Sequence, residues 1–205
     1  TGDTGSDLAA ARERSIGVCN VPTYATEAMA HMAITLVMAL SCSLWPQAKA
    51  LAAKDRTLVH QSHLGSLPHF ELTGKTLGLI GGTGTIGKRV AAMAQALGMR
   101  VVASSSSKPL GRRPDGIEVV SYGDLLSSSD FVSVHCPLNA ETKGLVDAEA
   151  ISKMKQSAYI INTARGGIIH QESLVSALRE RRIAGAALDV FGEQSFPRCC
   201  RACAH

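Results

Sequence analysis

Residues 76–87 read Thr-Leu-Gly-Leu-Ile-Gly-Gly-Thr-Gly-Thr-Ile-Gly, and this stretch decides the fold. The apolar run over 76–81 predicts a buried strand, and the periodicity of residues 86–97 predicts an amphipathic helix. Between them, residues 82–87 follow the pattern G-x-G-x-x-G. Because this pattern follows a strand and opens a helix, it has the context that a dinucleotide-binding turn requires.

Each glycine of this turn has its own physical task. Gly82 permits a tight turn, Gly84 lets the backbone approach a pyrophosphate, and Gly87 lets the helix pack closely against the strand. The start of the helix adds free N–H groups and a positive potential. The predicted dinucleotide-binding residues of the turn are Gly82, Thr83, Gly84, Thr85, Ile86 and Gly87. The alternative is a glycine-rich turn that binds no ligand.

Outward from this turn, short apolar runs alternate with helical patterns as far as residue 190. The predicted strands cover 76–81, 100–103, 118–120, 131–135, 158–162 and part of 183–190, and the predicted helices cover 86–97, 122–128, 148–155 and 172–181. Nearly continuous apolar strands separated by helices are typical of a parallel sheet covered on both faces. The predicted fold class is therefore α/β, with a doubly wound parallel sheet.

The part of the chain before residue 75 lacks this alternation. It is predicted as a short helix over 7–14, an extended piece over 16–21, an apolar helix over 26–45 that Thr26 caps and Pro46 ends or kinks, and a surface linker over 47–73. Residues 28–45 carry no Lys, Arg, Asp or Glu. Because this run also contains His31 and Thr35, a buried or interface helix is favoured over a membrane span.

The end of the second strand bears on the choice of dinucleotide. An NAD site needs an acidic side chain there to hold the ribose 2′-hydroxyl, but the chain has Ser104, Ser105, Ser106 and Ser107, followed by Lys108, Arg112 and Arg113. Hydroxyls and bases suit a 2′-phosphate. We therefore expect NADP or NAD as the cofactor, with NADP favoured. The alternative is that both arginines face solvent.

Composition narrows the class of protein. The 205 residues are 45% hydrophobic and 19% charged, with a net charge of +4 whose Lys and Arg are scattered, which argues against a nucleic-acid groove. Cys19, Cys42 and Cys136 lie in apolar stretches and are expected to be buried thiols of a reducing compartment, here the cytoplasm. The chain begins with Thr1, so organelle targeting stays open. Cys199, Cys200, Cys203 and His205 fall within seven residues, too compressed for a zinc site, and no metal is expected.

Several further motifs carry a family resemblance. They are Asn20-Val-Pro22, Gly74-Lys-Thr-Leu-Gly78, Gly82 to Gly87, Ala96-Leu-Gly-Met99, His135-Cys-Pro-Leu138 with Glu141-Thr142, Asn162-Thr-Ala-Arg-Gly-Gly167 and Leu188-Asp-Val-Phe191. In order and spacing this set resembles the D-isomer-specific 2-hydroxyacid dehydrogenases, which include glyoxylate/hydroxypyruvate reductases and phosphoglycerate dehydrogenases. The resemblance covers residues 1 to about 193. It implies a Rossmann-like NAD(P)-binding domain over 23–193, and hydride transfer between a nicotinamide and C2 of a small 2-oxo or 2-hydroxy acid.

The resemblance also implies roles for single residues. Arg165 would hold the substrate carboxylate; its alternative is an ion pair with a surface acid. Asp189 would lie near the nicotinamide; its alternative is a strand-end cap. His135 is expected to shape the loop rather than to act as an acid or base. The remaining cofactor-binding residues that the family pattern implies are His135, Cys136, Pro137, Thr142, Thr163 and Ala164.

The chain also departs from the family pattern. The glycine turn is one residue longer, since Gly81 and Gly82 both precede Thr83. The family's acid/base His is absent, and the position of its partner Glu holds Gln194. We therefore expect a fragment whose substrate domain is largely missing, with residues 1–22 as its remnant or hinge and 194–205 as an atypical, disordered tail.

Two functions follow from this reading. The first is a 2-oxo acid reductase whose dinucleotide-binding part is present here but incomplete for catalysis. The second is a non-catalytic dinucleotide-binding and dimerisation module related to the family. In the family, the helix that matches 26–45 is part of the dimer contact, so a homodimer is expected.

Overall fold

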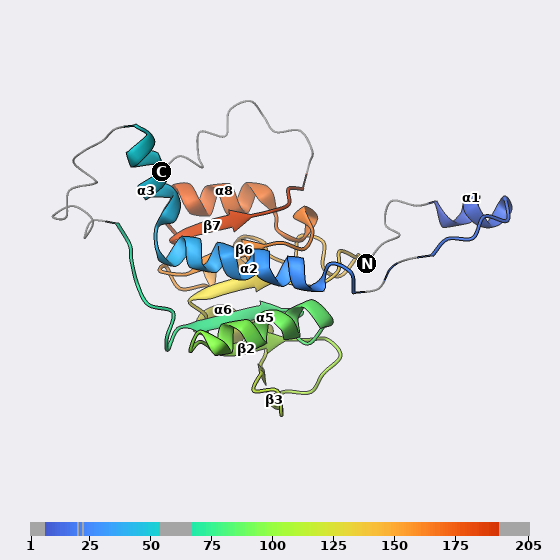
Figure 1. Ribbon diagram of the computed structural model, residues 1–205, viewed down its shortest axis with the longest axis horizontal. Helices are drawn as coiled ribbons and strands as arrows, with labels where there is room; N and C mark the ends of the chain where they lie inside the picture. Colours follow the sequence, from blue (N-terminus) through green and yellow to red (C-terminus); the bar gives the residue numbers. More distant parts are fainter. Residues whose placement is uncertain (1–6, 20, 22, 54–66, 193–205) are drawn as a thin grey trace.

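The computed structural model describes residues 7–19, 21, 23–53 and 67–192. Its centre is a seven-stranded sheet with the order β3-β4-β2-β1-β5-β6-β7. The strands are β1 (Thr76–Ile80), β2 (Arg100–Ser104), β3 (Gly111–Arg112), β4 (Glu118–Val119), β5 (Phe131–Val134), β6 (Tyr159–Asn162) and β7 (Gly185–Leu188). All neighbours pair in parallel except β3 and β4. The predicted doubly wound α/β fold is confirmed (Figure 1).

Helices cover both faces of the sheet. The α-helices of the described residues are α1 (Leu8–Glu13), α2 (Thr26–Ser41), α3 (Leu44–Ala52), α5 (Thr85–Ala96), α6 (Tyr122–Ser128), α7 (Ala148–Ser152) and α8 (Gln171–Arg179), and η2 (Gly166–Ile168) is a 3-10 helix. α1 buries no residue and lies away from the sheet in Figure 1. One buried cluster joins α2 and α5 to the sheet around Leu77 and Phe131, and a second joins α6, α7 and α8 around Val132 and Ile160. The result is a three-layer domain in which the parallel strands point to one common side in Figure 1, while the short strand β3 runs antiparallel to β4.

The connections place a switch point at the middle of the sheet. The chain leaves β1 for β2 on one side, and β5 pairs with the other side of β1. Ligands of doubly wound folds bind beyond the carboxyl ends of the strands at such a point. We therefore expect a ligand site at the loops that follow β1 and β5.

The predicted helix over 26–45 is confirmed as far as Ser41, and only its last four residues depart from the prediction. The chain forms α2 and α3 instead, separated at Ser43, which has a left-handed backbone with φ 48°. Pro46 neither ends nor kinks a long helix, because it lies in the first turn of α3, where a missing N–H breaks no helical bond. Thr26 does not cap α2 either, since Ala25 holds that position and makes no side-chain cap bond.

Smaller differences have local causes. The linker predicted over 47–73 begins as part of α3, and the two-residue strand β3 was not predicted, since Gly111 and Arg112 carry no apolar pattern. Cys19, expected to be buried, is exposed, whereas Cys42 and Cys136 are half-buried. Within the described ranges, no single helix has the length and apolar content to cross a membrane. Of the described helices, only α2 and α3 taken together have that length and apolar content, and the two helices are bent by 67° relative to each other.

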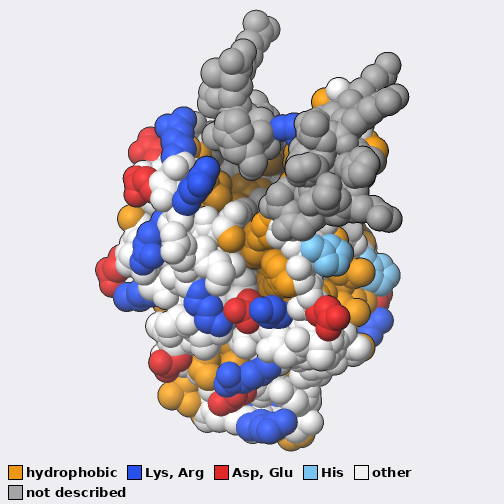
Figure 2. All heavy atoms as spheres, turned by 90° about the vertical axis from the view of Figure 1, so that its left-hand side faces the viewer, with side chains coloured by type: hydrophobic (Ala, Val, Ile, Leu, Met, Phe, Trp, Pro, Cys, Tyr) orange, Lys and Arg blue, Asp and Glu red, His pale blue; other side chains and the backbone are white. Residues whose placement is uncertain are grey.

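Figure 2 looks onto the side of the molecule where the strands begin. Lys and Arg side chains alternate there with Asp and Glu, and the largest apolar area borders the residues drawn in grey. Basic side chains therefore do not gather into one stripe on the face shown.

Candidate functional site

The carboxyl ends of five parallel strands bring the predicted site residues to one edge. Gly82 to Gly87 follow β1, Ser104 to Ser106 end and follow β2, and His135 to Pro137 follow β5. Thr163 to Arg165 follow β6, and Asp189 follows β7. The structure therefore brings together residues as far apart in sequence as Gly82 and Asp189, which are separated by 107 positions.

The glycine turn divides its tasks differently from the prediction. Gly81, with φ +80°, takes a left-handed conformation and so permits the tight turn, a task that the prediction gave to Gly82. Gly82 instead serves packing, because a Cβ there would lie 2.5 Å from Leu79 Cβ. A Cβ on Gly87 would lie 2.5 Å from Gly82 Cα, so helix and turn touch through backbone atoms, as predicted for Gly87.

Gly84 differs because space is left beside it. A Cβ there would meet only Gly81 O, at 3.5 Å, an ordinary contact. Gly84 is the N-cap of α5 and makes no side-chain cap bond. The first N–H groups of α5 thus emerge beside open space, an arrangement that can bind an anion.

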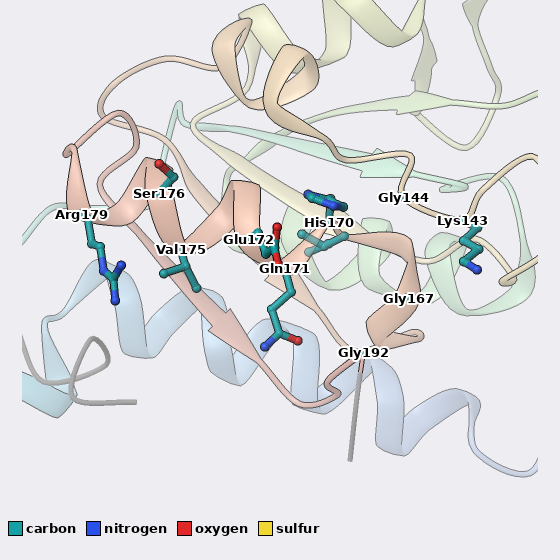
Figure 3. Close-up of a pocket in the computed structure, with 11 residues that line it drawn as sticks. Lys143, Gly144, Gly167, His170, Gln171, Glu172, Val175, Ser176, Arg179 and Gly192 are labelled. Atoms are coloured by element: carbon teal, nitrogen blue, oxygen red, sulfur yellow. The ribbon is translucent and has the colours of Figure 1, made fainter. Parts of the chain in front are cut away.

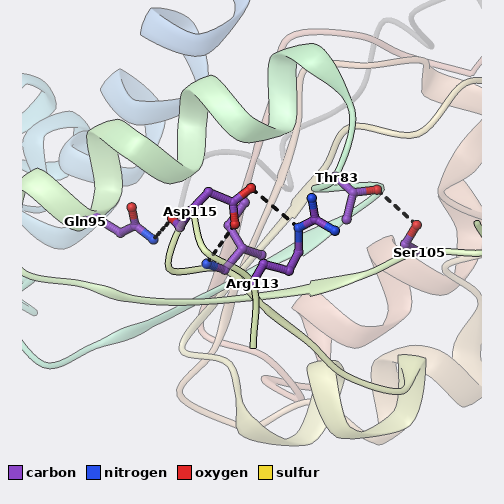
Figure 4. A network of polar contacts seen from close by, with 6 residues as sticks. Thr83, Gln95, Ser105, Arg113 and Asp115 are labelled. Carbon is purple, nitrogen blue, oxygen red and sulfur yellow. Dashed lines mark hydrogen bonds and ion pairs between the residues drawn. The ribbon is translucent and has the colours of Figure 1, made fainter. Parts of the chain in front are cut away.

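Hydroxyls meet where β2 ends beside this turn. Ser104 pairs in register with Ile80, and the hydroxyls of Thr83 and Ser105 lie 3.0 Å apart. Figure 4 shows Arg113 between this pair and Asp115, whose carboxylate lies 3.5 Å from Arg113 Nε. Arg112, in contrast, is exposed. The solvent-facing alternative therefore holds for Arg112, while Arg113 has an ionic partner.

Three glycine contacts tie the loops of this edge together. A Cβ on Gly81 would lie 2.8 Å from the backbone N of Cys136, and a Cβ on Gly167 would lie 3.2 Å from Leu138 Cδ2. A Cβ on Gly166 would lie 1.9 Å from the carbonyl carbon of Phe191. The loops after β1, β5, β6 and β7 are therefore each in contact with a neighbour.

At the end of β6, Asn162 holds the segment that follows. Its side chain is buried, its Nδ2 donates to Arg165 O at 2.9 Å, and its Oδ1 accepts from Ala164 N–H at 3.0 Å. Sequence reasoning missed this residue, although it opens the Asn-Thr-Ala-Arg-Gly-Gly motif. Thr163 is 1% exposed, and its hydroxyl has no hydrogen-bond partner among the described residues. A buried hydroxyl without a partner is costly and suits a ligand contact.

Arg165 and Asp189 are both exposed at this edge. Arg165 Nη1 donates to Ala164 O at 2.8 Å, which uses one of the five N–H donors of the guanidinium. The backbone N–H of Asp189 donates to Asn162 O at 3.0 Å and extends the ladder between β6 and β7. The structure thus brings the two charged residues onto adjacent loops.

His135 and Cys136 are uncharged near neutral pH. Burial lowers the pKa of His135 to about 4, and its Nε2 lies 2.9 Å from Ser133 Oγ. Burial also raises the pKa of the Cys136 thiol. Thr142 locks the same loop, because its hydroxyl accepts from Asn139 N–H at 2.9 Å and donates to Pro137 O at 2.6 Å. His135 therefore fits the predicted loop role.

A separate hollow lies along α8. It has a volume of about 660 Å³ and lies between the start of that helix and the loops of Gly144, Gly167 and Gly192 (Figure 3). Its charged lining residues are Lys143, Glu172 and Arg179. Residues of the glycine turn do not line it, so this hollow is not the dinucleotide edge.

Some predicted features lie outside the described residues. They are Asn20, Pro22, Gln194 and the set Cys199, Cys200, Cys203 and His205. Among the residues that are described, no group of three or more His, Cys, Asp or Glu could hold a metal ion.

Comparison with known proteins matches this chain to a family. The family model described as "D-isomer specific 2-hydroxyacid dehydrogenase, NAD binding domain" matches residues 34–203. The hydroxypyruvate reductase of Blautia hydrogenotrophica is 36% identical over 198 residues, which cover 93% of this chain and 59% of that protein.

Solved structures agree. The TT0316 protein from Thermus thermophilus has a TM-score of 0.83 and 39% identity, over 94% of this chain and 59% of that one. An acyclic imino acid reductase solved with NADPH and D-Arg has a TM-score of 0.80 and 32% identity, over 94% of this chain and 59% of that one. The chain thus spans about three fifths of the length of these proteins.

Proposed function

Because the chain belongs to the D-isomer specific 2-hydroxyacid dehydrogenase family and contains its NAD-binding domain, we propose that it binds a nicotinamide dinucleotide at the carboxyl edge of its sheet. We propose further that the whole protein reduces a small 2-oxo acid to a 2-hydroxy acid. The observation that carries the proposal is the glycine turn, in which Gly81, Gly82 and Gly87 are packed while Gly84 faces open space.

The residues at this edge fit such a cofactor. The space at Gly84 and the start of α5, which has no side-chain cap bond, suit the pyrophosphate. The Thr163 hydroxyl, which has no hydrogen-bond partner in the described part of the chain, suits a polar group farther along the edge. Asp189 and the loop of His135, Cys136 and Pro137 would border the nicotinamide end. A bound reduced nicotinamide would supply the hydride for C2 of the 2-oxo acid and be oxidised in that step.

Arg165 would bind the acid itself. A guanidinium can hold a carboxylate through two parallel hydrogen bonds and polarise the neighbouring carbonyl. The reduced oxygen must also take up a proton, and His135 does not suit that step, because a pKa of about 4 leaves it neutral near pH 7. We therefore assign dinucleotide and carboxylate binding to this chain and leave proton transfer to a residue beyond its described part.

Gly84→Ala tests the dinucleotide site directly. The φ of −74° allows alanine and the new Cβ has room, so the variant should fold as the wild type does while its methyl group fills the pyrophosphate space. Saturating NADH or NADPH should stabilise the wild type by about 3 kcal/mol at 100 times Kd, and G84A much less. A wild-type melting temperature that neither nucleotide raises would refute the proposal.

The cofactor preference rests on the end of β2. Thr83 and Ser105 offer hydroxyls and Arg113 a positive charge, which favours NADPH over NADH. We expect 2′,5′-ADP to bind more tightly than 5′-ADP. Arg113→Gln should remove that difference, whereas the exposed Arg112→Gln should leave it. Equal binding of both nucleotides by the wild type would contradict the preference.

Exposed apolar side chains on α2 and α3 support both the homodimer and the non-catalytic alternative. Met32, Met38, Leu44 and Trp45 expose apolar side chains on α2 and α3, with Trp45 66% exposed. We propose that a second copy covers them. Light scattering should show a dimer that Met38→Glu dissociates. The non-catalytic module is favoured if nucleotide strengthens that dimer while the chain oxidises no NADPH with glyoxylate or hydroxypyruvate.

A further inference from the structure

Arg165 and Asp189 lie on different loops, and both are bonded to one residue. The Asn162 side chain donates from Nδ2 to Arg165 O at 2.9 Å and accepts from Ala164 N–H at 3.0 Å. The backbone carbonyl of the same residue accepts from Asp189 N–H at 3.0 Å. Asn162 is therefore a common anchor for the two charged groups of the edge.

The chemistry of the asparagine side chain is specific to this place. Asn162 is 1% exposed, and both polar atoms of its amide are satisfied by backbone groups of the loop. One side must donate and the other must accept, which an amide does and neither a carboxylate nor an aliphatic chain can do. Loss of either hydrogen bond of the buried Asn162 amide would leave a backbone group of Ala164 or Arg165 unsatisfied, or would release the loop.

The contact of Gly166 completes the arrangement. Because a Cβ there would lie 1.9 Å from the carbonyl carbon of Phe191, the residue after Arg165 rests directly on the second residue after Asp189. The two loops are thus joined twice, through Asn162 on one side of Arg165 and through Gly166 on the other. A shift of the Arg165 backbone relative to the Asp189 backbone has to break at least one of these contacts.

We propose that Asn162 is a positioning residue that sets the separation of Arg165 and Asp189, and hence of the bound acid and the nicotinamide. The proposal rests on the proposed function, since it assumes that these two residues face the acid and the cofactor. Asn162 itself touches neither. Its side chain acts through the backbone of Ala164 and Arg165.

Two variants at this position and one matched control test the proposal. Asn162→Ala removes both side-chain bonds. Asn162→Asp keeps the acceptor for Ala164 and turns the Arg165 side into a repulsive oxygen pair. Ser129→Ala is the control, because Ser129 is fully buried and loses a comparable bond to Leu125 O, but lies before β5 at the other edge of the sheet. Each chain is titrated by calorimetry with ADP-ribose, with NADH, and with oxalate in saturating NADH.

We expect both Asn162 variants to bind oxalate at least tenfold more weakly and NADH several-fold more weakly, with ADP-ribose affinity within twofold of the wild type. S129A should resemble the wild type with all three ligands. Unchanged affinity of N162A for oxalate and NADH would overturn the proposal. An affinity for ADP-ribose that falls as much as the affinities for oxalate and NADH would also overturn it, because such a result marks a general effect on the fold. A wild type that binds ADP-ribose but not oxalate refutes the acid site of the proposed function, and the NADH comparison then decides the role of Asn162. A wild type that binds none of the three refutes both.

Discussion

Gly166→Ala should destabilise the domain by about 2–3 kcal/mol, because its methyl group has no room. The Cβ would lie 1.9 Å from Phe191 C, 2.1 Å from Phe191 O and 2.3 Å from Gly192 N. Carbon atoms rest about 3.5–4.0 Å apart, so one loop must move by roughly 1.5–2 Å. All three neighbours are backbone atoms, so rotation of a side chain cannot relieve the overlap.

The assay is urea unfolding combined with NADH titration. Two matched glycine variants separate this effect from the general effect of adding a methyl group. Gly167→Ala meets the flexible end of Leu138 at 3.2 Å and should cost less than about 1 kcal/mol. Gly123→Ala lies in α6 with no heavy atom within 4 Å and should stabilise the domain by up to about 1 kcal/mol.

Ligand binding provides the second readout for G166A. Displacing Arg165 from Asp189 should weaken the binding of NADH more than the binding of ADP-ribose, as we expect for the Asn162 variants. If G166A instead unfolds at the urea concentration of the wild type and keeps its NADH affinity, the loop contact is not close in solution, and the argument from backbone overlap is wrong.

The remaining predictions concern the buried hydroxyl of Thr163 and the half-buried imidazole of His135. Thr163→Val removes a buried hydroxyl that has no partner among the described residues, so the ligand-free domain should gain about 1 kcal/mol, measured by urea unfolding, while its NADH affinity falls; a variant that loses stability would show that the hydroxyl is bonded. Because the pKa of His135 falls from 6.5 to about 4, the unfolded chain binds a proton between these values that the folded chain does not. The free energy of unfolding should therefore decline by roughly 1 kcal/mol per pH unit as pH drops from 6.5 to 4, and His135→Asn should flatten that decline; identical pH profiles for the two proteins would contradict it.

Much of the fold could be predicted because its signals are local. The strand and helix on either side of the glycine turn follow from apolar periodicity, and Gly98, with φ +76°, follows the C-cap of α5. The break between α2 and α3 could not be predicted in this way, since Ser43 takes a left-handed conformation that its sequence does not announce. Ser43 is buried, so tertiary packing rather than residue propensity sets the break.

The candidate site could be predicted only in part. Parallel strands place their carboxyl ends at one edge, so the motifs that follow them had to converge. The charge of Arg113 was visible in sequence, but its pairing with Asp115 depends on the turn that joins β3 to β4, and β3 was missed. The exclusion of a side chain at Gly81 likewise depends on a distant residue, because a Cβ there would meet the backbone of Cys136 at 2.8 Å.

The contacts of Gly81 and Gly166 have a consequence for how this family's sequences can diverge. Each joins the missing side chain of a glycine to the backbone of its partner, at Cys136 and at Phe191. Mutation at the partner position leaves that backbone in place, so selection falls on one member of each pair and the other drifts freely. Residues 81 and 136, or 166 and 191, should therefore show little correlated substitution across relatives. Methods that infer proximity from covarying positions would pass over the contacts that hold this edge together.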